Sequence, residues 1–193
     1  MIYLVRHGQT VFNAESRLQG RLDSPLTERG RAQALVLGER LRGLLIEPEA
    51  VEIESSPQGR AKATAEIIRS SLAAPGAIRF DERLREISLG SWEGMTQSEI
   101  EVRWPGVWRS TVRQSWLETC PDGEPYAAAE GRLRAWLDGV SWNTPRVVVS
   151  HGVAIGILRG LYLGLSRAEM LEFPVPQGVI WAIGDGEVRP VGG

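Results

Sequence analysis

Short apolar runs in this sequence alternate with longer stretches in which apolar residues recur at helical spacing. Residues 2–5 form the first run, which consists of strand formers and ends at His7 and Gly8, where a glycine permits a tight exit. Thr27 is a residue type that favours a helix N-cap. The apolar residues after it have helical spacing: Ala34, Leu37, Leu41 and Leu44. This part of the chain is predicted to form a strand followed by a helix.

The same order of strand and helix is predicted twice more. Residues 51–56 have the composition of a strand, and a second helical stripe follows them: Ala61, Ala65, Ile68 and Leu72. Residues 146–150 form a third apolar run, which leads into His151-Gly152 and an apolar helix that ends near Gly164. Repeated alternation of this kind is typical of an α/β fold with a parallel sheet.

The stretch from about residue 92 to residue 125 has a different pattern. Thr96 and Glu99 have the spacing of a helix capping box. Four tryptophans occur there among charged residues: Trp92, Trp104, Trp108 and Trp116. We interpret this stretch as a short cap segment inserted into the α/β fold. We expect its tryptophans to be buried anchors of a small core rather than ligand contacts.

The pattern near the C-terminal end predicts a hairpin. Val179, Trp181 and Ile183 occupy alternate positions of an apolar run, and Asp185-Gly186 is a typical two-residue turn. The sequence contains no internal repeat, low-complexity tract or linker. We therefore expect residues 1–193 to form a single domain.

Composition limits the classes of partner. Of the 193 residues 42% are apolar, and 24 acidic and 22 basic residues leave a net charge of −2. No global field therefore favours nucleic acid or a membrane surface, and the apolar runs are far shorter than a membrane-spanning helix. The single cysteine, Cys120, cannot form an internal disulfide, and the first residues lack the pattern of a secretory signal. We expect a cytoplasmic protein that binds small ligands and that could form a homodimer.

The two histidines of the chain occupy equivalent positions. Each follows an apolar strand and precedes a glycine, as His7-Gly8 and as His151-Gly152. Ligands of open α/β sheets bind beyond the carboxyl ends of the strands. If the two strands are neighbours, both imidazoles project into one crevice, where they can act together.

A metal site is the alternative chemistry for such a pair. The sequence contains no HExxH motif, no cysteine cluster and no repeat of carboxylates and histidines at ligand spacing. We therefore expect neither a metal nor any other cofactor.

Further motifs surround the histidines in a specific order. They are Arg6-His7-Gly8 with Thr10 and Asn13, Gln19-Gly20, Leu26 to Gly30, Ser56-Pro57 with Arg60-Ala61 and Thr64-Ala65, Leu84-Arg85-Glu86 with Gly90 to Gly94, Pro121 to Glu124, and Ser150-His151-Gly152. In these motifs the sequence resembles the histidine phosphatase superfamily, in the branch of the cofactor-dependent phosphoglycerate mutases and their related phosphatases. The resemblance covers nearly the whole chain. It implies a mixed, mostly parallel sheet with helices on both faces.

The resemblance also implies roles for five residues. His7 is expected to be the nucleophile that becomes phosphohistidine, as a neutral imidazole can. Arg6 and Arg60 are expected to bind phosphoryl oxygens, because planar guanidinium groups match them in two-point contacts. His151 is expected to donate a hydrogen bond to the transferring group. Glu86 is expected to protonate the leaving alkoxide.

Three more residues resemble the phosphate and substrate contacts of this family: Asn13, Gln19 and Gly20. Glu82 and Glu93 are alternative proton donors to Glu86. The acid phosphatase branch has an aspartate directly after the second histidine, and Gly152 stands there in this chain. The resemblance is therefore to the mutase-like branch.

Three activities are compatible with these motifs. The short cap favours a phosphatase that hydrolyses a small phosphorylated metabolite. Val153-Ala154 favours the same activity, because the mutases have an Asn-Ser pair at this place. Three arginines of the cap keep a phosphoglycerate mutase as the alternative: Arg103, Arg109 and Arg113. A binding module without turnover is the third reading, although no catalytic residue is missing.

Overall fold

A computed structural model describes residues 1–107 and 119–192 of the chain. Its centre is a six-stranded sheet of order β3-β2-β4-β1-β5-β6. The strands are β1 (Ile2–Arg6), β2 (Glu52–Ser55), β3 (Arg79–Phe80), β4 (Arg146–Ser150), β5 (Ile180–Gly184) and β6 (Glu187–Val191). The first four strands of that order pair in parallel, and β5 and β6 join antiparallel. The predicted α/β fold with a mixed, mostly parallel sheet is confirmed.

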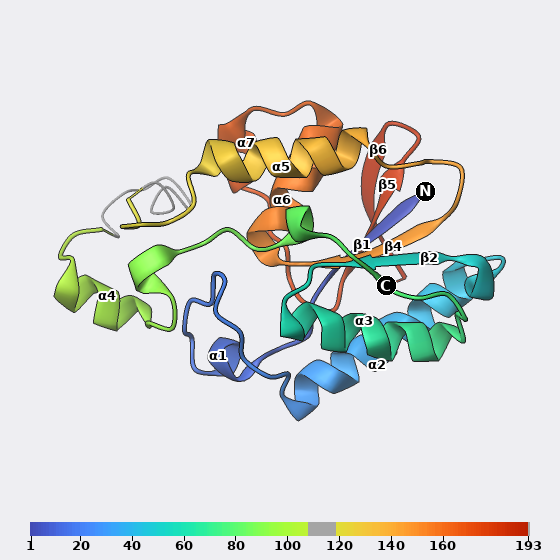
Figure 1. Ribbon diagram of the computed structural model, residues 1–193, viewed down its shortest axis with the longest axis horizontal. Helices are drawn as coiled ribbons and strands as arrows, with labels where there is room; N and C mark the ends of the chain where they lie inside the picture. Colours follow the sequence, from blue (N-terminus) through green and yellow to red (C-terminus); the bar gives the residue numbers. More distant parts are fainter. Residues whose placement is uncertain (108–118, 193) are drawn as a thin grey trace.

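Helices cover both faces of the sheet (Figure 1). One face carries α2 (Glu28–Leu44) and α3 (Gly59–Leu72), and the other carries α5 (Tyr126–Asp138), α6 (Gly152–Leu163) and α7 (Arg167–Leu171). Each face has its own apolar core. Alternate residues of β1 and β4 enter opposite cores, since successive strand side chains point to opposite faces.

The helix signals of the sequence act as expected. Thr27 N-caps α2 and accepts a hydrogen bond from the Gly30 N–H at 3.0 Å. The predicted stripe of α2 is buried except for Leu44, which is 38% exposed in the last turn. Gly164 ends α6 in the left-handed conformation, with φ of 67°.

The C-terminal hairpin is confirmed, with a turn at Asp185 and Gly186 between β5 and β6. Most of β5 is buried on both faces, because Ile180 enters the core on one face of the sheet and Ile183 enters the core on the other. In the described part of the chain, no helix has the length and apolar character needed to cross a lipid bilayer.

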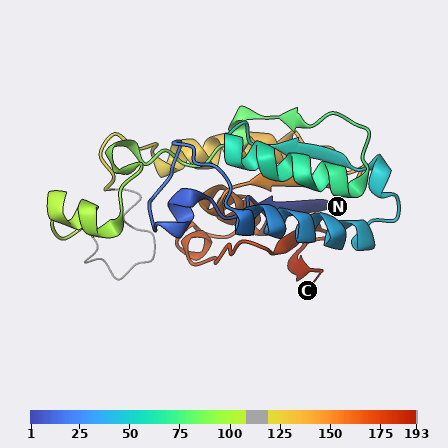
Figure 2. The ribbon, with the colours of Figure 1, turned by 90° about the horizontal axis from the view of Figure 1, so that it is seen from below.

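The cap segment lies beside the α/β sheet rather than within it. Its helix α4 (Gln97–Arg103) lies at the same end of the molecule as the short helix α1 (Val11–Ala14) (Figures 1 and 2). The capping box of Thr96 and Glu99 is present. Trp92 is fully buried and packs against the partly buried Trp104, with the ring centroids 6.1 Å apart and the planes inclined at 59°. Trp108 and Trp116 lie outside the described residues.

Candidate active site

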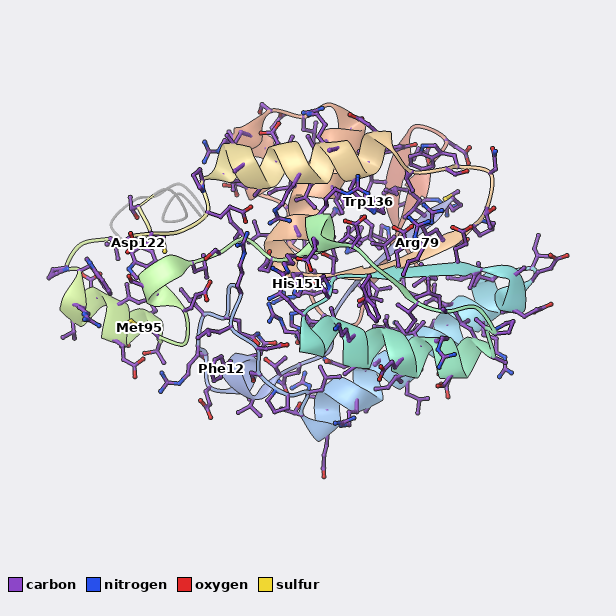
Figure 3. All side chains as sticks on the ribbon, viewed as in Figure 1. Phe12, Arg79, Met95, Asp122, Trp136 and His151 are labelled. Atoms are coloured by element: carbon purple, nitrogen blue, oxygen red, sulfur yellow. The ribbon has the colours of Figure 1, made fainter. Side chains whose placement is uncertain are left out.

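The parallel pairing of β1 with β4 brings the two histidines together. Arg6 is the register partner of Ser150, so His7 and His151 leave their strands side by side. Their ring centroids are 5.2 Å apart, with the planes inclined at 59°. His151 lies near the centre of the molecule, between the end of β4 and the start of α6 (Figure 3). The expectation that both imidazoles share one crevice is confirmed.

The hydrogen bonds of His7 define its tautomer. Nδ1 lies 2.8 Å from the carbonyl oxygen of Gly8, and a carbonyl can only accept, so Nδ1 carries the proton. Nε2 therefore keeps a lone pair, to which Nε of Arg60 donates at 3.2 Å. Burial, together with the charges of Arg60 and Arg6, holds the pKa of His7 well below 6.5. The ring is thus neutral at pH 7.

Arg60 is held by the loop between α1 and α2. Besides His7, its guanidinium donates to the carbonyl oxygens of Leu22 and Gly20, both at 2.8 Å, and to the carboxylate of Asp23 at 3.2 Å. Asp23 also accepts from the first backbone N–H groups of α3, which fixes the start of this helix. Burial lowers the pKa of Arg60, and the nearby carboxylates of Glu86 and Asp23 oppose this shift. A fixed cation therefore stands beside the lone pair of His7.

Arg6 supplies the second cation. Its Nη1 donates to the carbonyl oxygen of Val175 at 2.7 Å, while its buried Nε has no partner among the described residues. A Cβ on Gly152 would lie 3.3 Å from Cζ of Arg6, so glycine there allows the guanidinium to lie against the start of α6. Burial lowers the pKa of Arg6, and Glu86 opposes this shift.

His151 is fully buried and N-caps α6. Its Nε2 lies 2.8 Å from the hydroxyl of Ser56, and its buried Nδ1 has no hydrogen-bond partner among the described residues. Burial, followed by the charge of Arg60, holds the pKa of His151 well below 6.5. A neutral ring with one free nitrogen thus lies next to the ring of His7.

The carboxylate of Glu86 sits at the N-terminus of α6. It accepts from the backbone N–H groups of Val153, Ala154 and Ile87, each at 3.1 Å. Free N–H groups at a helix N-terminus favour an anion, so this end of α6 orients the carboxylate. The alternative proton donor Glu93 is bound elsewhere, because it accepts from the backbone of Arg21 and Leu89 at 2.9 Å.

A pocket of about 230 Å³ joins these groups. Its lining includes seven of the eight candidate residues: Arg6, His7, Asn13, Gln19, Gly20, Arg60 and Glu86. His151 is the eighth and lies buried beside them. The rest of the lining is mostly apolar, with one further arginine: Leu18, Ile87, Leu89, Val153, Phe173, Val175, Gly152 and Arg17. The site therefore combines a cationic end with apolar walls.

Some residues that build the site were missed in the sequence. Ser56 bonds His151, Asp23 holds Arg60, and Gln58 bonds the loop of Gly20 and the backbone of Glu86. Ser56 and Gln58 lie in or next to the Ser-Pro motif, so their proximity to Arg60 was the available signal. Thr10 caps α1 together with Asn13 and does not line the pocket.

The chain contains one thiol, that of Cys120. Burial raises the pKa of the Cys120 thiol to about 11, so it is protonated at pH 7. Within residues 1–107 and 119–192, no group of three or more His, Cys, Asp or Glu side chains is arranged to hold a metal ion.

Comparison with known proteins agrees with this site. Residues 2–186 match the histidine phosphatase superfamily (branch 1). A relative from Salmonella arizonae named "probable phosphoglycerate mutase GpmB" is 40% identical over 167 residues, covering 85% of this chain and 75% of the relative. The relative of that name from Citrobacter koseri is 41% identical over 170 residues, with the same coverage.

Two solved structures are similar over nearly the whole chain. Bacillus stearothermophilus YhfR has a TM-score of 0.82 and 34% identity, covering 98% of this chain and 94% of its own. Mycobacterial glucosyl-3-phosphoglycerate phosphatase, solved with VO3, has a TM-score of 0.75 and 30% identity, covering 98% of this chain and 95% of its own.

Proposed function

This chain belongs to branch 1 of the histidine phosphatase superfamily, and from that membership we propose that it is a metal-independent phosphatase of the cytoplasm. It hydrolyses a phosphomonoester of a small metabolite through phosphohistidine at His7. The observation that carries the proposal is the tautomer of His7, whose Nδ1 proton is held by Gly8 and whose Nε2 lone pair faces Arg60. A neutral imidazole whose Nε2 lone pair lies beside two cations is suited to attack phosphorus.

In the first step Nε2 of His7 attacks phosphorus and the bond to the ester oxygen breaks. The bound phosphoryl group offers Arg60 Nε a better acceptor than the imidazole, which frees the lone pair. Arg6, whose Nε has no partner among the residues that the structure describes, stabilises the negative charge that spreads over the equatorial oxygens. His151 Nδ1 donates to the same group. The carboxyl group of Glu86 gives its proton to the leaving alkoxide.

In the second step water attacks the phosphorus of phosphohistidine. The carboxylate of Glu86, now without its proton, takes one from that water, and inorganic phosphate leaves as the bond to Nε2 breaks. Neutral His7 and protonated Glu86 are regenerated, so the cycle consumes one water for each ester. Asn13 from α1, and Gln19 and Gly20 from the loop after it, bind the phosphoryl group or the adjoining part of the substrate.

Hydrolysis is preferred over a mutase reaction because of the pocket walls. A phosphoglycerate carries a second anion, yet Arg17 of the pocket is already bound by Glu15 at 3.1 Å and Glu99 at 2.7 Å. Arg103 of the cap stacks on Trp104 at 5.2 Å, and Arg109 and Arg113 lie outside the described residues. A solved structure named as a glucosyl-3-phosphoglycerate phosphatase is similar to this chain over 98% of its length.

A phosphoglycerate mutase is the second candidate. It is favoured by the 40% identity to a relative that carries this name. A mutase returns the phosphoryl group to a second substrate before water enters, so it would isomerise phosphoglycerate faster than it releases phosphate. The two activities are therefore separable in one assay.

The test is phosphate release from a panel of phosphomonoesters in the presence of EDTA. The panel contains an aromatic ester and sugar, nucleotide and glycerate phosphates, with His7→Ala as the control. We expect turnover that EDTA leaves unchanged and that is lost in the variant, because arginine and histidine supply the positive charge. Isomerisation of phosphoglycerate without phosphate release would establish the mutase instead. Silence of the native chain in both assays would overturn the proposed chemistry.

A further inference from the structure

Gln58 links two segments that are distant in the sequence. Its side chain is only 8% exposed, immediately before α3. The amide oxygen accepts from the backbone N–H of Glu86 at 2.8 Å, and the amide nitrogen donates to the carbonyl oxygen of Gly20 at 3.1 Å. Both ends of the amide are therefore used, which defines its orientation.

Each end of Gln58 meets a part of the candidate site. The carbonyl oxygen of Gly20 also accepts from Nη2 of Arg60 at 2.8 Å, and Arg60 in turn contacts His7. At the other end, the bonded N–H belongs to the residue whose carboxylate serves the leaving group. One side chain thus spans from the phosphoryl-binding group to the proton donor.

Gln58 does not itself line the pocket. Any effect on the reaction must therefore pass through the residues that it holds. Glu86 is held at two places. Its carboxylate is anchored at the start of α6 by the N–H groups of Val153 and Ala154, and its backbone N–H is held by Gln58. The bond from Gln58 is the described contact that ties this backbone to the loop of Gly20.

We propose that Gln58 is a positioning residue that sets the place of Glu86 relative to the phosphoryl group held by Arg60. This role rests on the proposed phosphatase function. Its physical basis is that proton transfer needs the donor within hydrogen-bond reach of the leaving oxygen. Displacement by about 1 Å costs on the order of 10²-fold in rate.

The test depends on the leaving group. A p-nitrophenolate leaves without a proton, whereas the alkoxide of glycerol needs one. Gln58→Met keeps the length of the side chain and removes both hydrogen bonds. We expect it to lower kcat/KM on glycerol phosphate by about 10- to 10²-fold. On p-nitrophenyl phosphate kcat/KM should change less than about threefold, because kcat/KM reports phosphorylation of His7 and not the later attack of water, which both esters share.

Two further variants separate positioning from loss of structure. Gln58→Glu keeps an acceptor for the Glu86 N–H and loses the donor to Gly20, so its loss on glycerol phosphate should be smaller than that of Gln58→Met. In the background of Glu86→Gln, adding Gln58→Met should cost no further activity on glycerol phosphate, because both changes remove one step. Gln33→Met is the matched control. The amide oxygen of Gln33 accepts from the backbone N–H of Gln9 at 2.8 Å, and Gln33 does not line the pocket.

The outcomes distinguish this role from the proposed function. Equal losses on both esters in Gln58→Met, or losses that add to those of Glu86→Gln, would overturn the positioning role while the native turnover upholds the phosphatase. Turnover of neither ester by the native chain would overturn the phosphatase and this role with it. If Gln58→Met does not fold, the selective loss is measured on Gln58→Glu, and equal losses there would overturn the role as well.

Discussion

The two strand-histidine-glycine units of this protein look alike in sequence and differ in their surroundings. His7 leaves β1 into an irregular loop, and both of its ring nitrogens are engaged, by Gly8 and by Arg60. His151 leaves β4 directly into α6, with one nitrogen on Ser56 and the other without a partner among the described residues. The same local pattern therefore yields two differently prepared imidazoles.

This comparison indicates that the hydrogen-bond partners of the two ring nitrogens determine the role of each histidine. In His7 the Nδ1 proton is donated to a backbone carbonyl, so Nε2 carries the lone pair, which accepts from Arg60. In His151 the hydroxyl of Ser56 can donate or accept, so that ring is able to present a proton at Nδ1. We assign attack on phosphorus to the first ring and hydrogen-bond donation to the second.

The largest expected effect follows from removing the attacking ring. His7→Ala should lower phosphate release by at least about 10³-fold, because the covalent path is lost. Native protein mixed with labelled ester and quenched in alkali should carry one label, and the variant none. Label retained in His7→Ala would show that another residue takes the phosphoryl group and would break the assignment of roles.

Removing the donating ring should have a smaller effect. His151→Ala should lower kcat by about 10²- to 10³-fold, the usual cost of losing one donor to developing charge. It should still acquire label at His7, only more slowly. If His151→Ala acquired no label and His7→Ala became labelled at His151, the roles of the two histidines would be the reverse of those assigned here.

The shared burial of both rings predicts a pH dependence of stability. Their pKa values lie well below 6.5 in the folded protein, so between pH 7.5 and 5.5 the unfolded chain takes up protons that the folded chain does not. The free energy of unfolding should therefore fall over this interval, by an amount on the order of 1 kcal/mol for each histidine.

Denaturant titration at both pH values, without phosphate in the buffer, measures this fall. His151→Asn should roughly halve it, because one of the two buried rings is gone. An unchanged stability across this interval would mean that both rings take up protons in the folded state as readily as in the unfolded chain, and would contradict the lowered pKa values of His7 and His151.

The smallest expected effect concerns the partner of His151. Ser56→Ala removes the hydroxyl that lies 2.8 Å from Nε2 of His151. It should lower kcat about tenfold, because His151 keeps its place at the end of β4 but its ring loses the contact that orients it. Comparison of kcat with that of His151→Ala is the measurement. A loss as large as that of His151→Ala would mean that Ser56 itself contacts the substrate.

Most of the secondary structure near the site could be predicted from the sequence. The apolar runs of β1, β2 and β4 and the stripes of α2 and α3 are patterns of near neighbours, and side-chain period decides strand or helix locally. The short helix α1 and the two-residue strand β3 (Arg79–Phe80) were not predicted, because segments of that length carry too little periodicity.

By itself the sequence determined the α/β alternation, the equivalent places of His7 and His151 and the motifs that identify the family. Only the tertiary structure decided the tautomer of His7, the anchoring of Glu86 on α6 and the bridge made by Gln58. The hydroxyl of Ser56 reaches His151 across 95 residues, and the amide of Gln58 reaches Glu86 across 28. Contacts of this kind depend on how sheet and helices pack, whereas a periodic pattern reports only on neighbours a few residues away.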